Sequence, residues 1–365
     1  MREANAVDFW RGFALVSIFV NHVPGNVFEG FTHKNVSISD AAEIFVFLAG
    51  WSLALATTNP KGWDSARRVV LRLLSRLVEV YRAQLVTTAI ALAMVAGAAV
   101  ILDNPLFLEW HNAGPVFADP VHATVGWVLM THQLGYFNIL PLYVVLLALA
   151  PPFVLLARRH AGLALLASSS LYLYCLVNEI SLPTWPTEGT WFFNPFTWQF
   201  LLMLGYVAAA TLRDRPALQS LAKRLQSIAI AGVLLAAALT WVDWRPDPFS
   251  VPEPRLLFLF DKGYLSPARL LHVLLLVLAF QGAFAHIARH APTLADQFSA
   301  LGRNSLAVFS VGSILSLAAW LVRFVTGGGM LVDIFVIGIG LACLAFTAWF
   351  VEWRTRSPRP SSLSS

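Results

Sequence analysis

The chain has 365 residues, of which 58% are hydrophobic and only 12% are charged, and its mean hydropathy is +0.67. This composition excludes a water-soluble domain, because so few polar residues cannot cover a core of that size. The net charge of +5 does not indicate nucleic-acid binding, since the basic residues are distributed among short loops. We therefore expect an all-α, polytopic integral membrane protein.

Ten segments are predicted to cross the membrane, since a spanning helix needs about 20 mainly apolar residues. In chain order they are 8–24, 40–58, 78–102, 137–157, 162–180, 195–212, 226–242, 267–289, 304–325 and 330–352. We expect them to form one transmembrane domain, 1–353. The remaining segment, 354–365, is rich in Ser and Pro and is predicted to be a disordered tail.

The positions of Lys and Arg predict that both termini face the cytoplasm. In this orientation the basic stretch 61–76, Arg158 and Arg159 lie inside, whereas the outer loops 103–136 and 181–194 contain no Lys or Arg. The outer loops are rich in Trp, Tyr and Phe. An interfacial aromatic belt explains this enrichment, and so does a set of platforms for the apolar faces of sugar rings.

The first predicted span contains several ionisable side chains. Arg11 and His22 share one helix face and lie about 16 Å apart along the axis. Asp8 is three residues before Arg11, and we expect a direct ion pair between them. Ionisable groups inside a membrane are costly, which favours a functional role over a purely structural one.

The next part of the chain gathers polar groups near the outer membrane surface. They include Asn21, His22, His33, Asp40 and Glu43. Asp40 is a possible cap for the second span, whereas Glu43, one turn further on, has no such explanation. Histidines beside carboxylates are typical of a general base that deprotonates a hydroxyl. We expect no metal site, because the spacing lacks the close i, i+4 pair of a zinc-binding helix.

Further candidates lie at the ends of other spans. His132, Asn138, Lys262, Arg269 and His272 would together line an outward-facing polar basin with positive charge for a carboxylate or a polar acceptor. On the cytoplasmic side a basic stretch offers charge for phosphates, although the positive-inside rule predicts such a cluster in any case. This stretch consists of Arg67, Arg68, Arg72 and Arg76.

The stretch "FWRGFALVSIFVNHVPGNVFEGFTHKNVSISDAAEIFVFLAG" closely resembles the N-terminal signature of the OpgC family, whose members succinylate osmoregulated periplasmic glucans. Later blocks of the family are similar to "ILPLYVVLLALAPP", "FFNPFTWQFLLMLGY", "LSPARLLHVLLLVLAF" and "LGRNSLAVFSVGS", so the resemblance covers nearly the whole chain. The spacing of Arg11 and His22 also resembles the R-x10-H pattern of the wider membrane acyltransferase-3 enzymes.

A second resemblance points to a different histidine. The segment "FTHKNVSISDAAEIFVFLAG" is similar to the active-site region of the transmembrane N-acetyltransferase of heparan sulfate degradation. That similarity implies acyl transfer by a histidine at the position of His33, with an asparagine at that of Asn21. His22 and His33 therefore both remain candidates.

The resemblance implies an enzyme of the bacterial inner membrane that takes a succinyl group from cytoplasmic succinyl-CoA and passes it to a periplasmic glucan. No cofactor is expected to stay bound. His33 or His22 would act as the base, Asn21 would stabilise the oxyanion, and Asp40 or Glu43 would orient the base. Direct transfer and a histidine acyl intermediate are both compatible with the sequence.

The remaining groups would bind substrate. Lys262, Arg269 or Arg11 would hold the free succinyl carboxylate, because a charged group needs a cationic partner once it leaves water. Asp8, His132, Asn138 and His272 complete the expected substrate-binding set, and the basic stretch 67–76 would hold the phosphates of the acyl-CoA.

Two other functions remain open. One is an O-acetyltransferase that acts on another cell-envelope polysaccharide. The other is a proton-coupled transporter, in which Asp8, Arg11, His22 and Glu43 form a relay.

Overall fold

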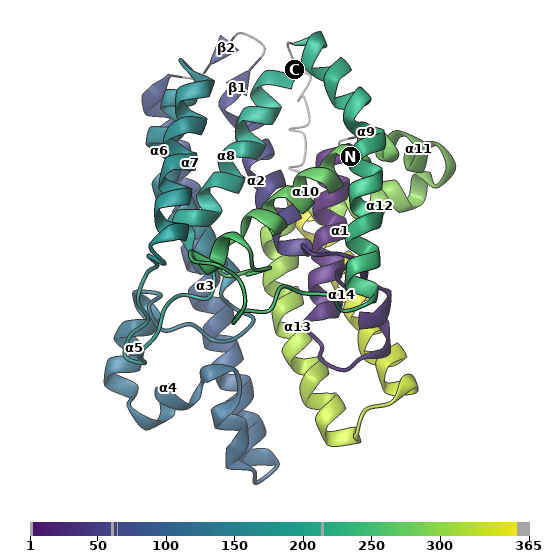
Figure 1. Cartoon of the computed structure of the whole chain (residues 1–365). Helices are drawn as coiled ribbons and strands as arrows, with labels where there is room; N and C mark the ends of the chain where they lie inside the picture. The colour runs from purple at the N-terminus through teal and green to yellow at the C-terminus, as the bar shows by residue number, and fades with distance from the viewer. Residues whose placement is uncertain (1–2, 60–61, 64, 213–214, 356–365) are drawn as a thin grey trace, which may run out of the picture.

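The computed structural model describes residues 3–59, 62–63, 65–212 and 215–355 of the chain, and it shows a bundle of long helices with irregular loops and short helices toward its lower half (Figure 1). The α-helices are α1 (Ala6–Asn21), α2 (Ala41–Thr57), α3 (Ala66–Ile101), α4 (Gly114–Ala118), α5 (Pro120–Val128), α6 (Ile139–Ala157), α7 (Ala161–Val177), α8 (Pro195–Leu212), α9 (Pro216–Trp241), α10 (Pro267–Ala279), α11 (Ala283–His290), α12 (Pro292–Arg303), α13 (Ser305–Thr326) and α14 (Met330–Thr355). Four 3-10 helices, η1 (Val27–Phe31), η2 (His33–Val36), η3 (Pro105–Asn112) and η4 (Arg255–Leu257), and two antiparallel two-residue strands, β1 (Thr58–Asn59) and β2 (Gly62–Trp63), complete the described chain.

The predicted helical fold is confirmed, and each of the ten predicted spans corresponds to helix in the structure. Within the described residues, six helices are long and apolar enough to cross a membrane: α3, α6, α8, α9, α13 and α14. The bent pair α10 and α11 makes a seventh, and α2 and α7 are shorter apolar helices of 17 residues each. The protein is therefore a polytopic membrane protein.

Several helix boundaries differ from those predicted. Helix α3 begins at Ala66, twelve residues before the predicted span, because Ser65 caps it and its polar first turns lie outside the apolar stretch. Helix α14 continues to Thr355, so the first two residues of the predicted tail are helical. The rest of that tail, 356–365, lies outside the described residues.

The predicted span 267–289 is broken in the structure. Helix α10 ends at Ala279, α11 begins at Ala283, and their axes differ by 49°. Gly282, between them, has a φ of +82°, a left-handed conformation that glycine adopts without strain. The bend places the short, amphipathic α11 beside α12.

Helix α12 was not predicted, because its sequence is too polar for a span. It nevertheless packs closely along α1. A Cβ atom on Gly12 of α1 would lie 1.9 Å from the carbonyl oxygen of Phe298, and one on Gly302 of α12 would lie 1.8 Å from that of Asp8. Only glycine permits so close an approach of two helix backbones.

The bundle core lies where α2 packs against α8, with α1, α6 and α13 around them. Trp198 and Tyr206 of α8 are among the largest fully buried side chains. The Trp198 indole donates to the carbonyl oxygen of Gly263 (3.0 Å), which fixes the loop before α10 against the outer end of α8. This loop carries Lys262, so the core packing also determines where that ammonium group lies.

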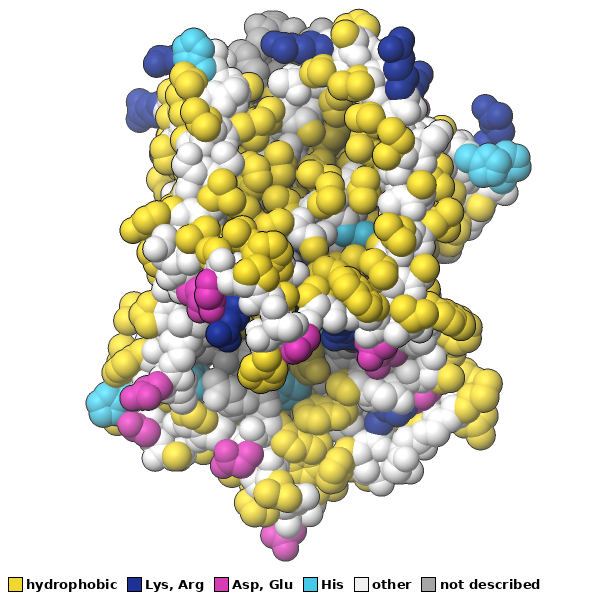
Figure 2. All heavy atoms as spheres, in the orientation of Figure 1, with side chains coloured by type: hydrophobic (Ala, Val, Ile, Leu, Met, Phe, Trp, Pro, Cys, Tyr) yellow, Lys and Arg dark blue, Asp and Glu magenta, His cyan; other side chains and the backbone are white. Residues whose placement is uncertain are grey.

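Charged side chains are unevenly distributed on the surface. Most of the visible Lys and Arg side chains gather at the upper end of the molecule, and the Asp and Glu side chains in view lie in the lower half (Figure 2). A broad belt of hydrophobic side chains occupies the region between them. By the positive-inside rule we expect the basic end to face the cytoplasm.

A candidate active site of two adjoining cavities

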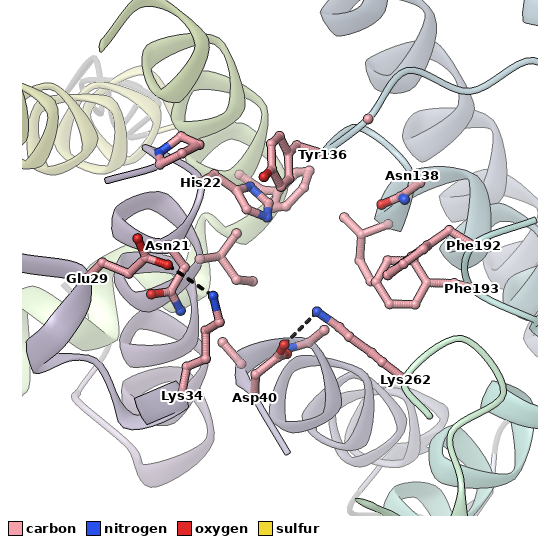
Figure 3. Close-up of a pocket in the computed structure, with 17 residues that line it drawn as sticks. Asn21, His22, Glu29, Lys34, Asp40, Tyr136, Asn138, Phe192, Phe193 and Lys262 are labelled. Carbon is pink, nitrogen blue, oxygen red and sulfur yellow. Dashed lines mark hydrogen bonds and ion pairs between the residues drawn. The ribbon is translucent and has the colours of Figure 1, made fainter. Parts of the chain in front are cut away.

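A polar cavity of about 340 Å³ opens beside the C-terminal end of α1 (Figure 3). Its wall combines the end of α1, the loop between α1 and α2, and the segments that precede α6, α8 and α10. Its polar and aromatic side chains are Asn21, His22, Glu29, Lys34, Asp40, Tyr136, Asn138, Phe192, Phe193, Lys262 and Phe309. The structure thus brings together five of the predicted site residues, Asn21, His22, Asp40, Asn138 and Lys262.

Two ion pairs lie on the wall of this cavity. Lys34 pairs with Glu29 at 3.0 Å, and Lys262 pairs with Asp40 at 2.5 Å (Figure 3). Burial alone would raise the pKa of Asp40, but the charges of Lys262 and Arg269 hold it well below its usual range. Asp40 is therefore a carboxylate at neutral pH, and the cavity carries two positive and two negative groups.

A third ion pair lies inside the bundle, next to the cavity. Arg269 of α10 binds the fully buried Glu43 of α2 through two nitrogens, at 2.6 and 2.5 Å. Glu43 also accepts the backbone N–H of Asp40 (3.0 Å), and Asp40 accepts that of Ala42 (2.8 Å), as expected for a cap of α2. Both carboxylates thus bind cations of the α10 region, and no side-chain hydrogen bond joins either of them to a histidine among the described residues. That Asp40 or Glu43 orients a histidine stays a prediction.

The two candidate histidines open into different cavities. His22 lines the polar cavity, and its Nδ1 is buried without a hydrogen-bond partner among the described residues. His33 lines a separate cavity, and neither of its ring nitrogens has a partner in the described chain. Burial lowers the pKa of His33, and the charge of Asp40 offsets only part of this effect. The His33 imidazole is therefore neutral at pH 7.

The second cavity is apolar and has a volume of about 400 Å³. It lies between α1, α2 and the break between α10 and α11, and its wall extends from Ala6 in the first turn of α1 to His33. The ring of His33 packs 5.7 Å from that of Phe13. Apart from His33, the wall is formed by Ala6, Val7, Trp10, Phe13, Ile44, Phe47, Leu48, Trp51, Leu276, Val277, Phe280, Gln281 and Gly282.

The two cavities adjoin at the loop between α1 and α2. His33 lines the apolar cavity and the next residue, Lys34, lines the polar one. The same loop therefore forms part of the wall of both cavities. Asn21 supports the same loop, because its amide oxygen accepts the hydroxyl hydrogen of Thr32 (2.7 Å).

The predicted ion pair between Asp8 and Arg11 does not form. Asp8 instead binds the side chain of Asn5 (2.6 Å) at the start of α1. Arg11 donates to the hydroxyls of Ser52 in α2 (3.4 Å) and Ser305 in α13, and among the described residues no carboxylate is paired with it. The prediction failed because helix rotation turns Arg11 into the bundle, toward two other helices.

His132 and His272 do not reach the polar cavity. The Nδ1 of His272 lies 2.8 Å from the Ser39 hydroxyl and accepts the Ser39 backbone N–H (3.3 Å), so His272 anchors the start of α2. His132 is buried in the outer loops, and its ring nitrogens have no partner in the part of the chain that is described. Neither residue lines the polar or the apolar cavity.

The predicted phosphate-binding arginines lie at the start of α3, and none of them lines either cavity. Arg72 donates to the Ala56 carbonyl at the end of α2, and Arg76 pairs with Glu79 at 2.7 Å. A third cavity, of about 510 Å³, lies beside this region and is lined by Ala66, Leu155, Leu156, Arg158 and Arg159. The remaining arginines of the stretch, Arg67 and Arg68, belong to the first turn of α3.

Several residues of the polar cavity and its surroundings were not among the predicted site residues. Tyr136, Phe192, Phe193, Glu29 and Lys34 line the cavity, and the ring of His111 packs 5.3 Å from that of Tyr136. The aromatic enrichment of the outer loops was the available signal for Tyr136, Phe192 and Phe193. His111 gave none, because an isolated histidine in a long loop has no pattern that predicts its neighbours.

The sequence was also compared with known proteins. The model of the family described as OpgC protein matches residues 2–356. No curated protein and no solved structure matches the chain.

Proposed function

We propose that this chain, which belongs to the OpgC family, is an O-succinyltransferase that moves a succinyl group from cytoplasmic succinyl-CoA to hydroxyls of periplasmic glucans. Family membership supports a role in the biosynthesis of osmoregulated periplasmic glucans. The observation that carries the proposal is the pair of adjoining cavities, one polar and one apolar, each with a histidine on its wall that has a buried ring nitrogen without a hydrogen-bond partner among the described residues.

The polar cavity suits a sugar. Tyr136, Phe192 and Phe193 offer apolar ring faces, and the amide of Asn138 offers a hydrogen-bond donor and an acceptor. Ligand sites typically combine such apolar walls with a few polar groups that fix orientation. We therefore assign one glucosyl unit of the acceptor to this cavity.

The apolar cavity suits the acyl-CoA arm. It runs between membrane helices, and the indole N–H groups of Trp10 and Trp51 and the side chain of Gln281 are among the few polar groups beside its apolar walls. A donor that enters from the Ala6 end would bring its thioester toward His33. The basic stretch 67–76 and the Arg158–Arg159 pair are the groups that we assign to the phosphates of the donor.

The proposed reaction uses His22 as the general base, because this imidazole opens into the cavity assigned to the sugar. His22 takes the proton from the hydroxyl, and the oxygen attacks the thioester carbonyl. The carbon–sulfur bond breaks, and the proton passes from His22 to the leaving thiolate. The amide N–H₂ of Asn21, whose oxygen already accepts a hydrogen bond from Thr32, is available to stabilise the oxyanion.

The free succinyl carboxylate needs a cation near the reacting carbonyl. Arg269 does not line the polar cavity and is bound to Glu43, and Arg11 lies about 16 Å from His22 along α1. Lys34 and Lys262 both face the cavity. Lys34 is the more exposed of the two, with 48% of its side chain accessible against 31% for Lys262. We therefore assign the carboxylate to Lys34.

The test is mass spectrometry of periplasmic glucans from cells that carry each histidine variant. The exposed His122, which pairs with Asp119 at 2.8 Å and lines neither cavity, provides the matched control. We expect His122→Ala to give succinylated glucans as the wild type does, and His22→Ala to lower succinylation by at least about 100-fold. Wild-type succinylation in His22→Ala would refute its role as the base. Wild-type levels in both His22→Ala and His33→Ala would instead favour the transport function.

Donor identity is tested with the purified protein. We expect it to consume succinyl-CoA in the presence of glucan, and we expect Lys34→Gln to slow this reaction more than any reaction with acetyl-CoA. Consumption of acetyl-CoA but not of succinyl-CoA by the wild type would contradict the succinyl assignment. It would support the O-acetyltransferase alternative.

A further inference from the structure

Four rings form a continuous row from the end of α1 to α13. The ring centroid of His22 lies 4.8 Å from that of Tyr136, and Tyr136 lies 5.3 Å from His111. His111 in turn lies 4.6 Å from Trp320 of α13. Figure 3 shows Tyr136 directly beside His22 at the polar cavity. We call these four side chains the ring row.

The two middle members of the ring row have unusual backbones. The φ of His111 is +54° and that of Tyr136 is +66°, a left-handed conformation that residues with bulky side chains rarely adopt. Such conformations carry backbone strain, and they cluster at functional sites. The surrounding structure must therefore hold both residues against this strain.

Two hydrogen bonds hold the segments that carry these residues together. The Gly135 N–H donates to the His111 carbonyl (2.8 Å), and the Asn112 side chain donates to the Gln133 carbonyl (3.2 Å). Phe137, next to Tyr136, is buried against α3 and α13 in a small apolar cluster. The loop 130–138 and η3 thus form one unit that presents Tyr136 to His22.

His22 lacks the usual means of orienting a catalytic imidazole. A histidine base is normally fixed by a carboxylate or carbonyl that accepts its second N–H. Here the nearby carboxylate of Asp40 binds Lys262, and the buried Nδ1 of His22 has no partner among the residues described. The ring contact with Tyr136 is an observed contact that restrains the imidazole plane.

We propose that Tyr136 and His111 are positioning residues, which hold the His22 imidazole for proton transfer by ring packing in place of a hydrogen-bonded carboxylate. This inference rests on the proposed function of His22. Tyr136 also lines the polar cavity, whereas His111 does not and reaches His22 by ring packing through Tyr136. His111 is therefore the residue at which positioning and substrate contact can be separated.

The test compares two substitutions of His111. His111→Ala removes the ring, and we expect kcat to fall by between about tenfold and a hundredfold, with little change in the KM for glucan, because a misplaced base slows the reaction without weakening binding. His111→Phe keeps a ring but no nitrogen, and we expect it to restore most of kcat. If His111→Phe were as slow as His111→Ala, a ring nitrogen would be required, and the proposal would be wrong.

Trp110 provides a matched control for loss of packing. Trp110 lies in η3 beside His111, and its ring packs against Trp320 of α13. No ring contact joins Trp110 to Tyr136 within the described chain. We expect Trp110→Leu to lower thermal stability about as much as His111→Ala does, but to leave kcat unchanged. An equal loss of kcat in Trp110→Leu would show that general loosening of the loop is responsible, which would overturn the proposal.

A second measurement does not depend on activity. Diethyl pyrocarbonate modifies accessible imidazoles, and mass spectrometry of peptides measures its rate at each histidine. We expect His22 to react several-fold faster in His111→Ala than in the wild type or His111→Phe, with the exposed His122 as an internal reference. An unchanged rate at His22 would overturn the positioning role. If the wild type had no transferase activity, the proposed function would fail while this measurement still decided the positioning role.

Discussion

Arg323, near the end of α13, and Asp333, in the first turn of α14, form a buried ion pair that holds the loop between α1 and α2. Arg323 also donates to the Gly25 carbonyl (2.6 Å), and Asp333 accepts the Val27 N–H (2.8 Å). The short turn between α13 and α14 brings the two charges together. The same pair therefore fixes one end of the loop that lines both cavities.

Removing one member of this pair should destabilise the protein strongly. We expect Arg323→Met to lower the free energy of unfolding by about 3–5 kcal/mol, because Asp333 would remain as an unpaired buried charge. The double variant Arg323→Met/Asp333→Leu should be more stable than Arg323→Met alone. Thermal unfolding of the detergent-solubilised variants measures both effects. Additive losses from the two substitutions would contradict this account of the pair.

The close contact of α1 with α12 gives a second prediction. Gly12→Ala and Gly302→Ala should each destabilise the protein by about 1–3 kcal/mol or more, because the new methyl group would overlap a backbone carbonyl. Gly338 of α14 is the matched control, since a Cβ there meets no atom within 4 Å. Gly338→Ala should leave the thermal midpoint unchanged or raise it slightly. Equal effects at all three positions would show that helix propensity, and not packing, is being measured.

Arg11 should prove to be functional and not stabilising. Its charge is held inside the bundle by two serine hydroxyls, an arrangement that offsets little of the cost of burial. We expect Arg11→Met to keep or raise the thermal midpoint but to lower glucan succinylation, because a charge kept inside the bundle at such a cost indicates a functional role. A lowered midpoint with unchanged succinylation would instead indicate a structural role.

His111 should make stability depend on pH. Burial lowers the pKa of its imidazole from 6.5 to about 4, so the folded protein resists a proton that the unfolded chain accepts. The contribution of the neutral imidazole to stability is complete above pH 6.5 and is lost as the pH falls toward 4. We expect His111→Phe to lose less stability than the wild type as the pH falls from 6.5 to about 4. Thermal midpoints at a series of pH values measure this difference. Parallel curves for the two proteins would contradict this.

Much of the fold follows from local sequence. Apolar runs of about 20 residues identified each of the ten main helices, because the cost of burying unpaired backbone groups in lipid leaves helices as the default for such runs. Boundaries were less certain where polar residues extend a helix beyond its apolar part, as at Ala66 of α3. Helix α12 was missed because it is recognised by its contact with α1 and not by hydropathy.

The candidate site was only partly predictable. Sequence reasoning named Asn21, His22, Asp40, Asn138 and Lys262, which the structure brings to one cavity. It placed carboxylates beside histidines, whereas Glu43 binds Arg269, 226 residues away. Such pairings depend on the rotation of each helix, which hydropathy does not report.

The sequence by itself determined that this protein is helical, lies in a membrane and gathers ionisable groups beside the C-terminal end of its first helix, because those properties depend on residues close together in the chain. The tertiary structure alone decided that His22 opens into a polar cavity and His33 into an apolar one. It also decided that the ring of Tyr136 packs against that of His22, and the ring of His111 against that of Tyr136. These relationships arise from packing between segments up to hundreds of residues apart, where shape and rotation decide which side chains meet.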